Sequence, residues 1–215
     1  MRTALACLLL LVLAVAAAAR MTHGFSAFTA EQARRLYVQE RQPLLPQTRL
    51  IDAAGNTHAL REWLQADGRA WIVDFIYTRC ETLCSVLGTQ YQRIQANLRR
   101  RHLDARVGLL TISFDPARDD GPALAAYARR MGADPAIWRI ARVADPADLP
   151  GLLRFFGVVV IDDGHGDFQH NAALLWVDAS GRLSRIVDYG DAWSDPVLAP
   201  YLAPTAREAA DERQP

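Results

Sequence analysis

Two apolar runs of strand length, each followed by a helical pattern, constrain the fold of this chain most strongly. Residues 70–77 and 107–114 are rich in aliphatic, β-branched and aromatic side chains, which is typical of strands that are covered on both faces. The spacing of apolar residues predicts helices over 84–101 and 119–131, directly after these strands. The order strand, helix, strand, helix predicts parallel strands joined by right-handed crossovers.

Shorter patterns after this core complete the predicted fold. The expected elements are a third strand over 137–143, a third helix over 146–156, a β-hairpin of strands 172–177 and 183–187, and a last helix near 196–202. The hairpin is predicted because Asp178-Ala179-Ser180-Gly181 separates two apolar runs. This order predicts an α/β, thioredoxin-like fold with a central mixed sheet flanked by helices, in which chemistry lies where the first core strand gives way to its helix.

The first twenty residues have the layout of a secretory signal peptide. Arg2 precedes an apolar run from Ala4 to Ala19, and the small residues Ala17 and Ala19 offer an A-x-A cleavage site. We therefore expect residues 1–19 to be a cleaved signal peptide, with a retained membrane anchor as the alternative. Both alternatives place the protein in the periplasm, soluble or anchored by its leader.

The rest of the chain divides into three predicted segments. Residues 20–47 form an N-terminal extension, residues 48–204 the thioredoxin-like domain, and residues 205–215 a polar, flexible tail. In the extension, Thr29 with Gln32 three residues later predicts the start of a helix. The 24 basic residues are balanced by 24 acidic ones, so no positive field is available and nucleic acid is not an expected partner.

Two cysteines in one pentapeptide provide the candidate chemistry. Cys7 lies in the leader, and Cys80 and Cys84 stand at the junction between the first core strand and its helix. Residues four apart at a helix start have Cβ atoms about 5–6 Å apart, so both sulfurs can point at one ligand or bond to each other. A disulfide around three intervening residues adds little stability, whereas a helix N-terminus favours the thiolate form. Two thiolates with one imidazole suit copper in either oxidation state.

Five histidines are candidates for the third ligand. We expect His23, His58 and His102 to be solvated surface residues, because each lies in a polar or irregular segment. His165 and His170 lie in the glycine-rich loop 164–171, directly before the predicted strand at 172. A residue that enters this strand lies at the sheet edge where the cysteines emerge, which favours His170 and leaves His165 as its rival.

Three separated motifs resemble the Sco/SenC family of copper-binding, thioredoxin-like proteins. They are Asp74-Phe75-Ile76-Tyr77-Thr78-Arg79-Cys80-Glu81-Thr82-Leu83-Cys84, Thr111-Ile112-Ser113-Phe114-Asp115-Pro116-Ala117-Arg118-Asp119, and His170 before Leu175-Trp176-Val177-Asp178-Ala179-Ser180-Gly181. The resemblance covers about residues 48–202 in family order. It implies a periplasmic chaperone that assists assembly of the binuclear copper centre of cytochrome c oxidase.

The resemblance also implies the ligands and the partners. One copper ion, Cu(I) or Cu(II), would be held by Cys80, Cys84 and His170, and the copper-receiving subunit of cytochrome c oxidase would take it. A periplasmic thiol reductant would keep the cysteines reduced. Glu81 and Gln169 replace a proline and an aspartate that the family often carries. Neither change removes a ligand, but both are expected to influence the reduction potential of the cysteine pair.

The main alternative is a thiol-disulfide oxidoreductase in which Cys80 and Cys84 form the redox-active pair. Dedicated oxidoreductases generally use C-x-x-C and place a proline opposite the cysteines, and this chain has no proline between Pro150 and Pro196. Such an enzyme also has no need of His170. A metallochaperone is therefore favoured over an enzyme. Asp115 and Arg118 are predicted to be a turn and helix-start pair without a catalytic role.

Overall fold

A computed structural model describes residues 2–22, 24–79 and 83–188, and for residues 83–87 it describes only the backbone. The predicted helix near 196–202, the predicted tail, His23 and Cys80 lie outside the described residues. The chain divides into two compact units, Met1–Gln42 and Pro43–Pro215.

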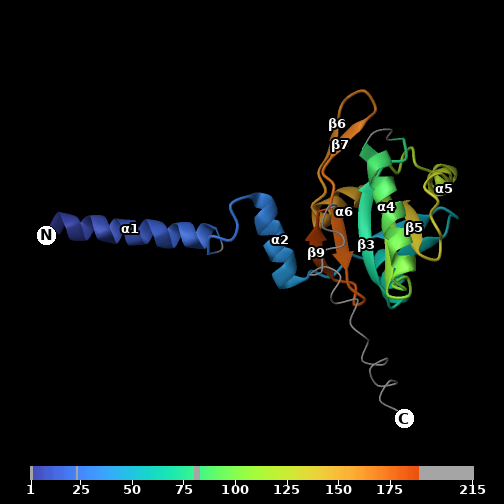
Figure 1. Cartoon of the computed structure of the whole chain (residues 1–215). Helices are drawn as coiled ribbons and strands as arrows, with labels where there is room; N and C mark the ends of the chain where they lie inside the picture. The colour runs from blue at the N-terminus through green and yellow to red at the C-terminus, as the bar shows by residue number, and fades with distance from the viewer. Residues whose placement is uncertain (1, 23, 80–82, 189–215) are drawn as a thin grey trace, which may run out of the picture. The chain divides into compact units, whose positions relative to one another are not determined.

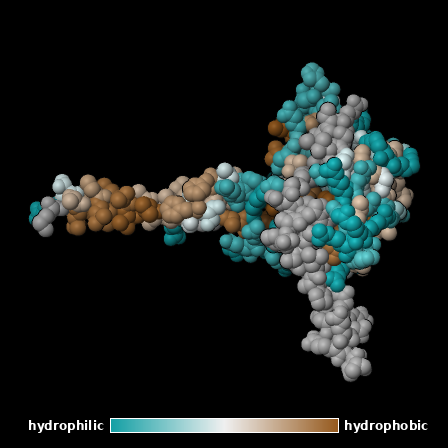
Figure 2. All heavy atoms as spheres, in the orientation of Figure 1, coloured by the Kyte–Doolittle hydropathy of each residue, from teal (hydrophilic) through white to brown (hydrophobic). Residues whose placement is uncertain are grey.

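The first unit consists of two helices, α1 (Arg2–Met21) and α2 (Ala30–Arg41). α1 is long and apolar enough to cross a membrane and has no buried residue, and Figure 2 shows its hydrophobic surface. A signal sequence has the same properties. α2 begins as predicted, because the Thr29 hydroxyl accepts from the Gln32 backbone N–H and the Gln32 side chain accepts from the Thr29 N–H.

The second unit is built on a seven-stranded sheet with the order β2-β1-β5-β4-β3-β8-β9 among the described residues (Figure 1). The strands are β1 (Arg49–Asp52), β2 (Thr57–Ala59), β3 (Ala70–Ile76), β4 (Val107–Ser113), β5 (Trp138–Val143), β8 (Leu174–Val177) and β9 (Leu183–Val187). β3, β4 and β5 are parallel, whereas β1 and β8 run antiparallel to their neighbours. The predicted α/β fold with a mixed central sheet is confirmed.

Helices cover both faces of this sheet. They are α3 (Leu60–Gln65), α4 (Leu83–Arg100), α5 (Gly121–Arg130) and α6 (Leu149–Phe156), the last preceded by the 3-10 turn η1 (Pro146–Asp148). On one face, Tyr91 of α4 packs on Trp138 of β5 with ring centroids 5.2 Å apart. On the other face, Phe156 of α6 packs on Phe75 of β3, also at 5.2 Å. β3 and β4 are buried at every residue, as their continuous apolar sequences predict.

The strand β2, the helix α3 and a further hairpin were not predicted. The hairpin consists of β6 (Val160–Asp162) and β7 (Phe168–His170), which form a separate two-stranded sheet. Strands of three residues are too short to show a period of two, so this region looked like a loop. The strand expected from 172 begins instead at Leu174, because Asn171 uses its side chain to bond the Gly157 carbonyl and the Val159 N–H.

Candidate metal centre

His170 is the last residue of β7 and lies opposite Val160 of β6. The prediction that it lies in a loop was wrong, because the hairpin closes at the Asp162–Phe168 pair. Two glycines in the turn, Gly164 and Gly166, have φ of 75° and 99°, a region that favours glycine. The chain therefore reverses its direction between β6 and β7, and His170 lies on a strand whose backbone is paired.

The two nitrogens of the His170 imidazole differ in their contacts with the described residues. Nδ1 lies 3.0 Å from the carbonyl oxygen of Asn171. Nε2 is buried and has no hydrogen-bond partner among the residues that the structure describes. Burial lowers the pKa of His170, and the hydrogen bond to the Asn171 carbonyl opposes this by a smaller amount. The neutral ring that donates from Nδ1 presents the Nε2 lone pair for a metal ion.

An aromatic cluster holds this imidazole at the carboxyl ends of β3 and β4. The His170 ring meets Phe114, directly after β4, edge to face at a centroid distance of 5.0 Å. Phe168 packs edge to face on Tyr77 at 5.2 Å and on Phe114 at 5.5 Å. The Tyr77 hydroxyl also donates to Asp167 at 3.3 Å. The hairpin is thus anchored on the ends of the two central strands.

The same end of β3 leads to the cysteines. Tyr77 follows the last residue of β3, and Cys80 is three residues further along the chain. Cys84 is the second residue of α4, of which only the backbone is described there. The sheet therefore brings His170 beside the stretch that precedes Cys80, while the sulfur positions lie outside the described structure. Among the described residues no three His, Cys, Asp or Glu side chains form a metal cluster.

The other histidines have different surroundings. His165 is exposed in the hairpin turn, and His102 is exposed after α4. His58, which was expected to be solvated, is partly exposed, and its ring is also bound to protein groups. Its ring stacks on Trp63 at 4.1 Å, and its Nε2 lies 2.9 Å from Asp52 Oδ2. His170 thus combines a buried nitrogen that has no partner in the described part of the chain with a position near the cysteine stretch.

Two residues near this centre have contacts that the sequence did not reveal. Arg118 pairs with Asp115 as predicted, and it also donates to the Gly166 carbonyl at 3.0 Å. Asp119 is fully buried and accepts hydrogen bonds from Thr78. From the sequence, Asp119 was expected only to begin a helix. The close spacing of three charged residues after a buried strand was the only signal for these long-range contacts.

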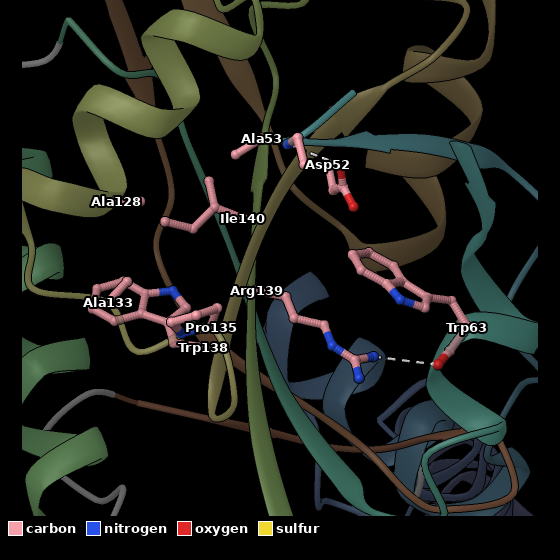
Figure 3. A pocket seen from close by; sticks show the side chains of 10 residues that line it. Asp52, Ala53, Trp63, Ala128, Ala133, Pro135, Trp138, Arg139 and Ile140 are labelled. Atoms are coloured by element: carbon pink, nitrogen blue, oxygen red, sulfur yellow. Dashed lines mark hydrogen bonds between the residues drawn. The ribbon is translucent and has the colours of Figure 1, made fainter. Parts of the chain in front are cut away.

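A cavity of about 400 Å³ lies at the other end of the sheet, beside α3 and the start of β5 (Figure 3). Its charged groups are already engaged. Arg139 donates to the Trp63 carbonyl at 3.4 Å and forms an ion pair with Asp67. Asp52 accepts from His58 and from backbone N–H groups. The two charged side chains that line this cavity are thus bound to protein groups, and the candidate centre is placed at His170.

Comparisons with known proteins identify the family and the fold. The SCO1/SenC family profile matches residues 38–200. The "SCO1 protein homolog" of Bacillus subtilis (strain 168) is 24% identical over 131 residues, which are 60% of this chain. The match spans 66% of that relative, slightly under two thirds of its length.

Solved structures share the fold. A SCO1/SenC family lipoprotein from Bacillus anthracis str. Ames aligns with a TM-score of 0.65 and 18% identity, over 76% of this chain and 97% of that one. Bradyrhizobium japonicum ScoI with copper bound aligns with 0.57 and 22%, over 74% and 100%. BsSco, described as a member of the Sco family of cytochrome c oxidase assembly proteins with a disulfide switch, aligns with 0.58 and 22%, over 77% and 100%. The predicted thioredoxin-like fold is thereby confirmed.

Proposed function

This chain belongs to the SCO1/SenC family, and we propose that it is a periplasmic copper-binding chaperone that assists assembly of the binuclear copper centre of cytochrome c oxidase. Copper is its cargo. The proposed ligands are the sulfurs of Cys80 and Cys84 and Nε2 of His170, and the proposed recipient is the copper-receiving subunit of the oxidase.

The observation that carries this proposal is the buried Nε2 of His170 without a partner among the described residues. A buried polar atom left unsatisfied costs about 1–3 kcal/mol, so its retention calls for a compensating ligand. A metal ion satisfies a neutral imidazole nitrogen, and the lowered pKa keeps the ring neutral. The remaining cysteines are the soft ligands that complete a copper site.

The chain's own residues supply a simple transfer device. Asn171 fixes the tautomer of His170 through Nδ1, and Phe114 limits the rotation of the ring. The hairpin that carries His170 is joined to the main sheet by side-chain contacts and not by strand pairing among the described residues. We propose that an incoming ligand of the partner displaces the imidazole first, because one imidazole on a short hairpin exchanges more readily than two adjacent thiolates.

The relatives support the choice of cargo. Bradyrhizobium japonicum ScoI was solved with copper bound, and BsSco is described with cytochrome c oxidase assembly. Export is supported by the apolar helix α1 and by the lipoprotein among the structural neighbours. A periplasmic thiol reductant is part of the proposal, because disulfides form readily in that compartment and only thiolates bind the metal.

The experiment is a copper titration of the reduced full-length protein with two matched histidine variants. His170→Ala should weaken copper binding at least tenfold and change the thiolate-to-copper absorption band, because it removes a ligand. His165→Ala should behave as the wild type, because this ring is exposed in the turn. An equal response of the two variants, or no copper uptake by the wild type, would refute the proposal.

The second candidate is a thiol-disulfide oxidoreductase, favoured by the disulfide switch described for BsSco. In that reaction one thiolate attacks a substrate disulfide, and the second cysteine resolves the mixed disulfide, so the substrate gains two electrons and the protein loses them. His170→Ala separates the two candidates. It should leave disulfide reductase activity unchanged if the enzyme function is the correct one.

A further inference from the structure

We infer that the segment from Asp115 to Asp119, which joins β4 to α5, positions both halves of the centre. Asp119 fixes the stretch that leads to Cys80, and Arg118 fixes the hairpin that carries His170. Neither residue is a proposed ligand, so both act as positioning residues. The copper readouts rest on the proposed function, whereas the readouts on the metal-free protein do not.

Asp119 binds a single residue of the cysteine stretch through both of its oxygens. Its carboxylate accepts from the Thr78 backbone N–H at 2.9 Å and from the Thr78 hydroxyl at 2.6 Å, and it also accepts from the Ser113 hydroxyl. Asp119 is 0% exposed, so these bonds are shielded from water. Three donors converge on one buried carboxylate, which is more than a helix start requires.

Arg130 of α5 completes the hold on Thr78. Its guanidinium donates to the Thr78 carbonyl at 2.8 Å and lies over the Tyr127 ring at 5.3 Å. All three polar groups of Thr78 are therefore bound, and this residue is only two positions before Cys80. The backbone that enters the proposed thiolate pair is consequently fixed in position and in direction by charged side chains.

Arg118 reaches the other half of the centre. Its Nη1 donates to the Gly166 carbonyl in the hairpin turn at 3.0 Å, and its guanidinium lies 5.0 Å from the Phe168 ring centroid. The ion pair with Asp115 directs the guanidinium from the β4 side. Phe168 and His170 are two residues apart in β7, so they lie on the same face of the strand. Arg118 thereby fixes the position of the face of β7 that carries His170 against Phe114.

Asp119 and Arg118 are neighbours in sequence, so one short segment sets the distance between the two ligand-bearing stretches. This arrangement preorganises a site, because the supporting side chains are bound to protein groups. A structural role alone explains the burial of Asp119. It does not explain why the partners of both residues that are distant in sequence, Thr78 for Asp119 and Gly166 with Phe168 for Arg118, lie in the two stretches that carry the proposed ligands.

The first test compares Asp119→Asn with Asp120→Asn, a neighbouring carboxylate that caps α5 by accepting from Ala123 N–H at 2.9 Å. Asp119→Asn should change the alkylation rate of the thiols in the reduced, metal-free, full-length protein and should weaken copper affinity about tenfold or more. Asp120→Asn should lower Tm alone. The inference fails if both variants lower Tm and neither alters thiol reactivity.

The second test uses Arg118→Gln, with the exposed Arg129→Gln of α5 as control. Arg118→Gln should shift the NMR signals of the His170 ring in the metal-free protein, and Arg129→Gln should not. The effect of Arg118→Gln on copper affinity should vanish in a His170→Ala background, whereas the effect of Asp119→Asn should persist there. Unshifted His170 signals, or an Arg118 effect that survives without His170, would overturn the inference.

Absence of copper binding by the wild type would refute the proposed function and leave the two metal-free measurements decisive.

Discussion

At the scale of single residues, two polar side chains, His170 and Asp74, have buried atoms without a hydrogen-bond partner in the described structure. His170 has its Nδ1 bound to a backbone carbonyl and its Nε2 buried without a partner among the described residues. Asp74 is the corresponding case among carboxylates in the described chain, since neither of its buried oxygens has a hydrogen-bond partner. Burial raises the pKa of Asp74 to about 7, and the nearby Thr111 and Tyr91 hydroxyls lower it by less.

The raised pKa of Asp74 predicts that stability falls as pH rises. The folded protein holds a proton on Asp74 up to about pH 7, whereas the unfolded chain loses it near 3.8. The stabilising contribution is therefore full below about pH 3.8 and is lost as pH rises through 7. Asp74→Asn should remove this part of the pH dependence and raise the free energy of unfolding at pH 8 by a few kcal/mol, on the order of 1.4 per pKa unit.

Urea unfolding of the wild type and of Asp74→Asn between pH 4 and pH 9 measures this effect. Asp148→Asn is the matched control, because it makes the same substitution at an exposed position. Parallel pH profiles for Asp74→Asn and the wild type would show that Asp74 is not the group that titrates.

At the scale of secondary structure, long buried elements were predictable and short ones were not. β3 and β4 have seven buried residues each, and α4 has an apolar face over five turns, so their periodicity is plain in the sequence. β6 and β7 have three residues each and depend on contacts with Tyr77 and Phe114, which are distant in sequence. The family resemblance and the chain order favoured His170 over His165. That its Nε2 is buried without a partner among the described residues follows only from the three-dimensional structure.

The β6–β7 hairpin predicts a separation between stability and function. Phe168→Ala removes ring contacts with Tyr77 and Phe114 and the stacking of Arg118, so the hairpin should loosen while the main sheet persists. Amide exchange in residues 160–170 should accelerate, and the contribution of His170 to copper affinity should fall. Ile161→Ala is the control on the same hairpin, because Ile161 is 58% exposed.

Hydrogen exchange of the full-length protein distinguishes these outcomes by segment. Faster exchange confined to the hairpin in Phe168→Ala, with little change in Ile161→Ala, is the expected result. Exchange that accelerates equally throughout β3 and β4 would mean that Phe168 supports the central sheet and does not act locally.

At the scale of the whole molecule, copper loading and thiol oxidation should exclude each other. Two cysteines with three residues between them can close a disulfide in an oxidising compartment, and a disulfide leaves no thiolate to bind the metal. The oxidised full-length protein should take up no copper, and reduction should restore uptake of about one ion. Counting free thiols beside copper uptake tests this exclusion, and equal loading of both forms would favour the oxidoreductase function.

The remaining unit, Met1–Gln42, predicts where the protein is found. The helix α1 has no buried residue and is long enough to span a membrane, so we expect it to serve export as a cleaved signal or as a retained anchor. N-terminal sequencing of protein from the periplasmic and membrane fractions decides between the two. A mature chain that begins at Arg20 indicates cleavage after Ala19, whereas recovery of the full chain with the membrane indicates an anchor.

X-ray absorption at the copper edge tests the central claim most directly. The reduced full-length protein loaded with one equivalent of copper should show two sulfur neighbours and one imidazole nitrogen. The nitrogen contribution should disappear in His170→Ala and persist in His165→Ala. A copper environment without two sulfurs, or one that keeps its imidazole in His170→Ala, would contradict the assignment of Cys80, Cys84 and His170 as the copper ligands.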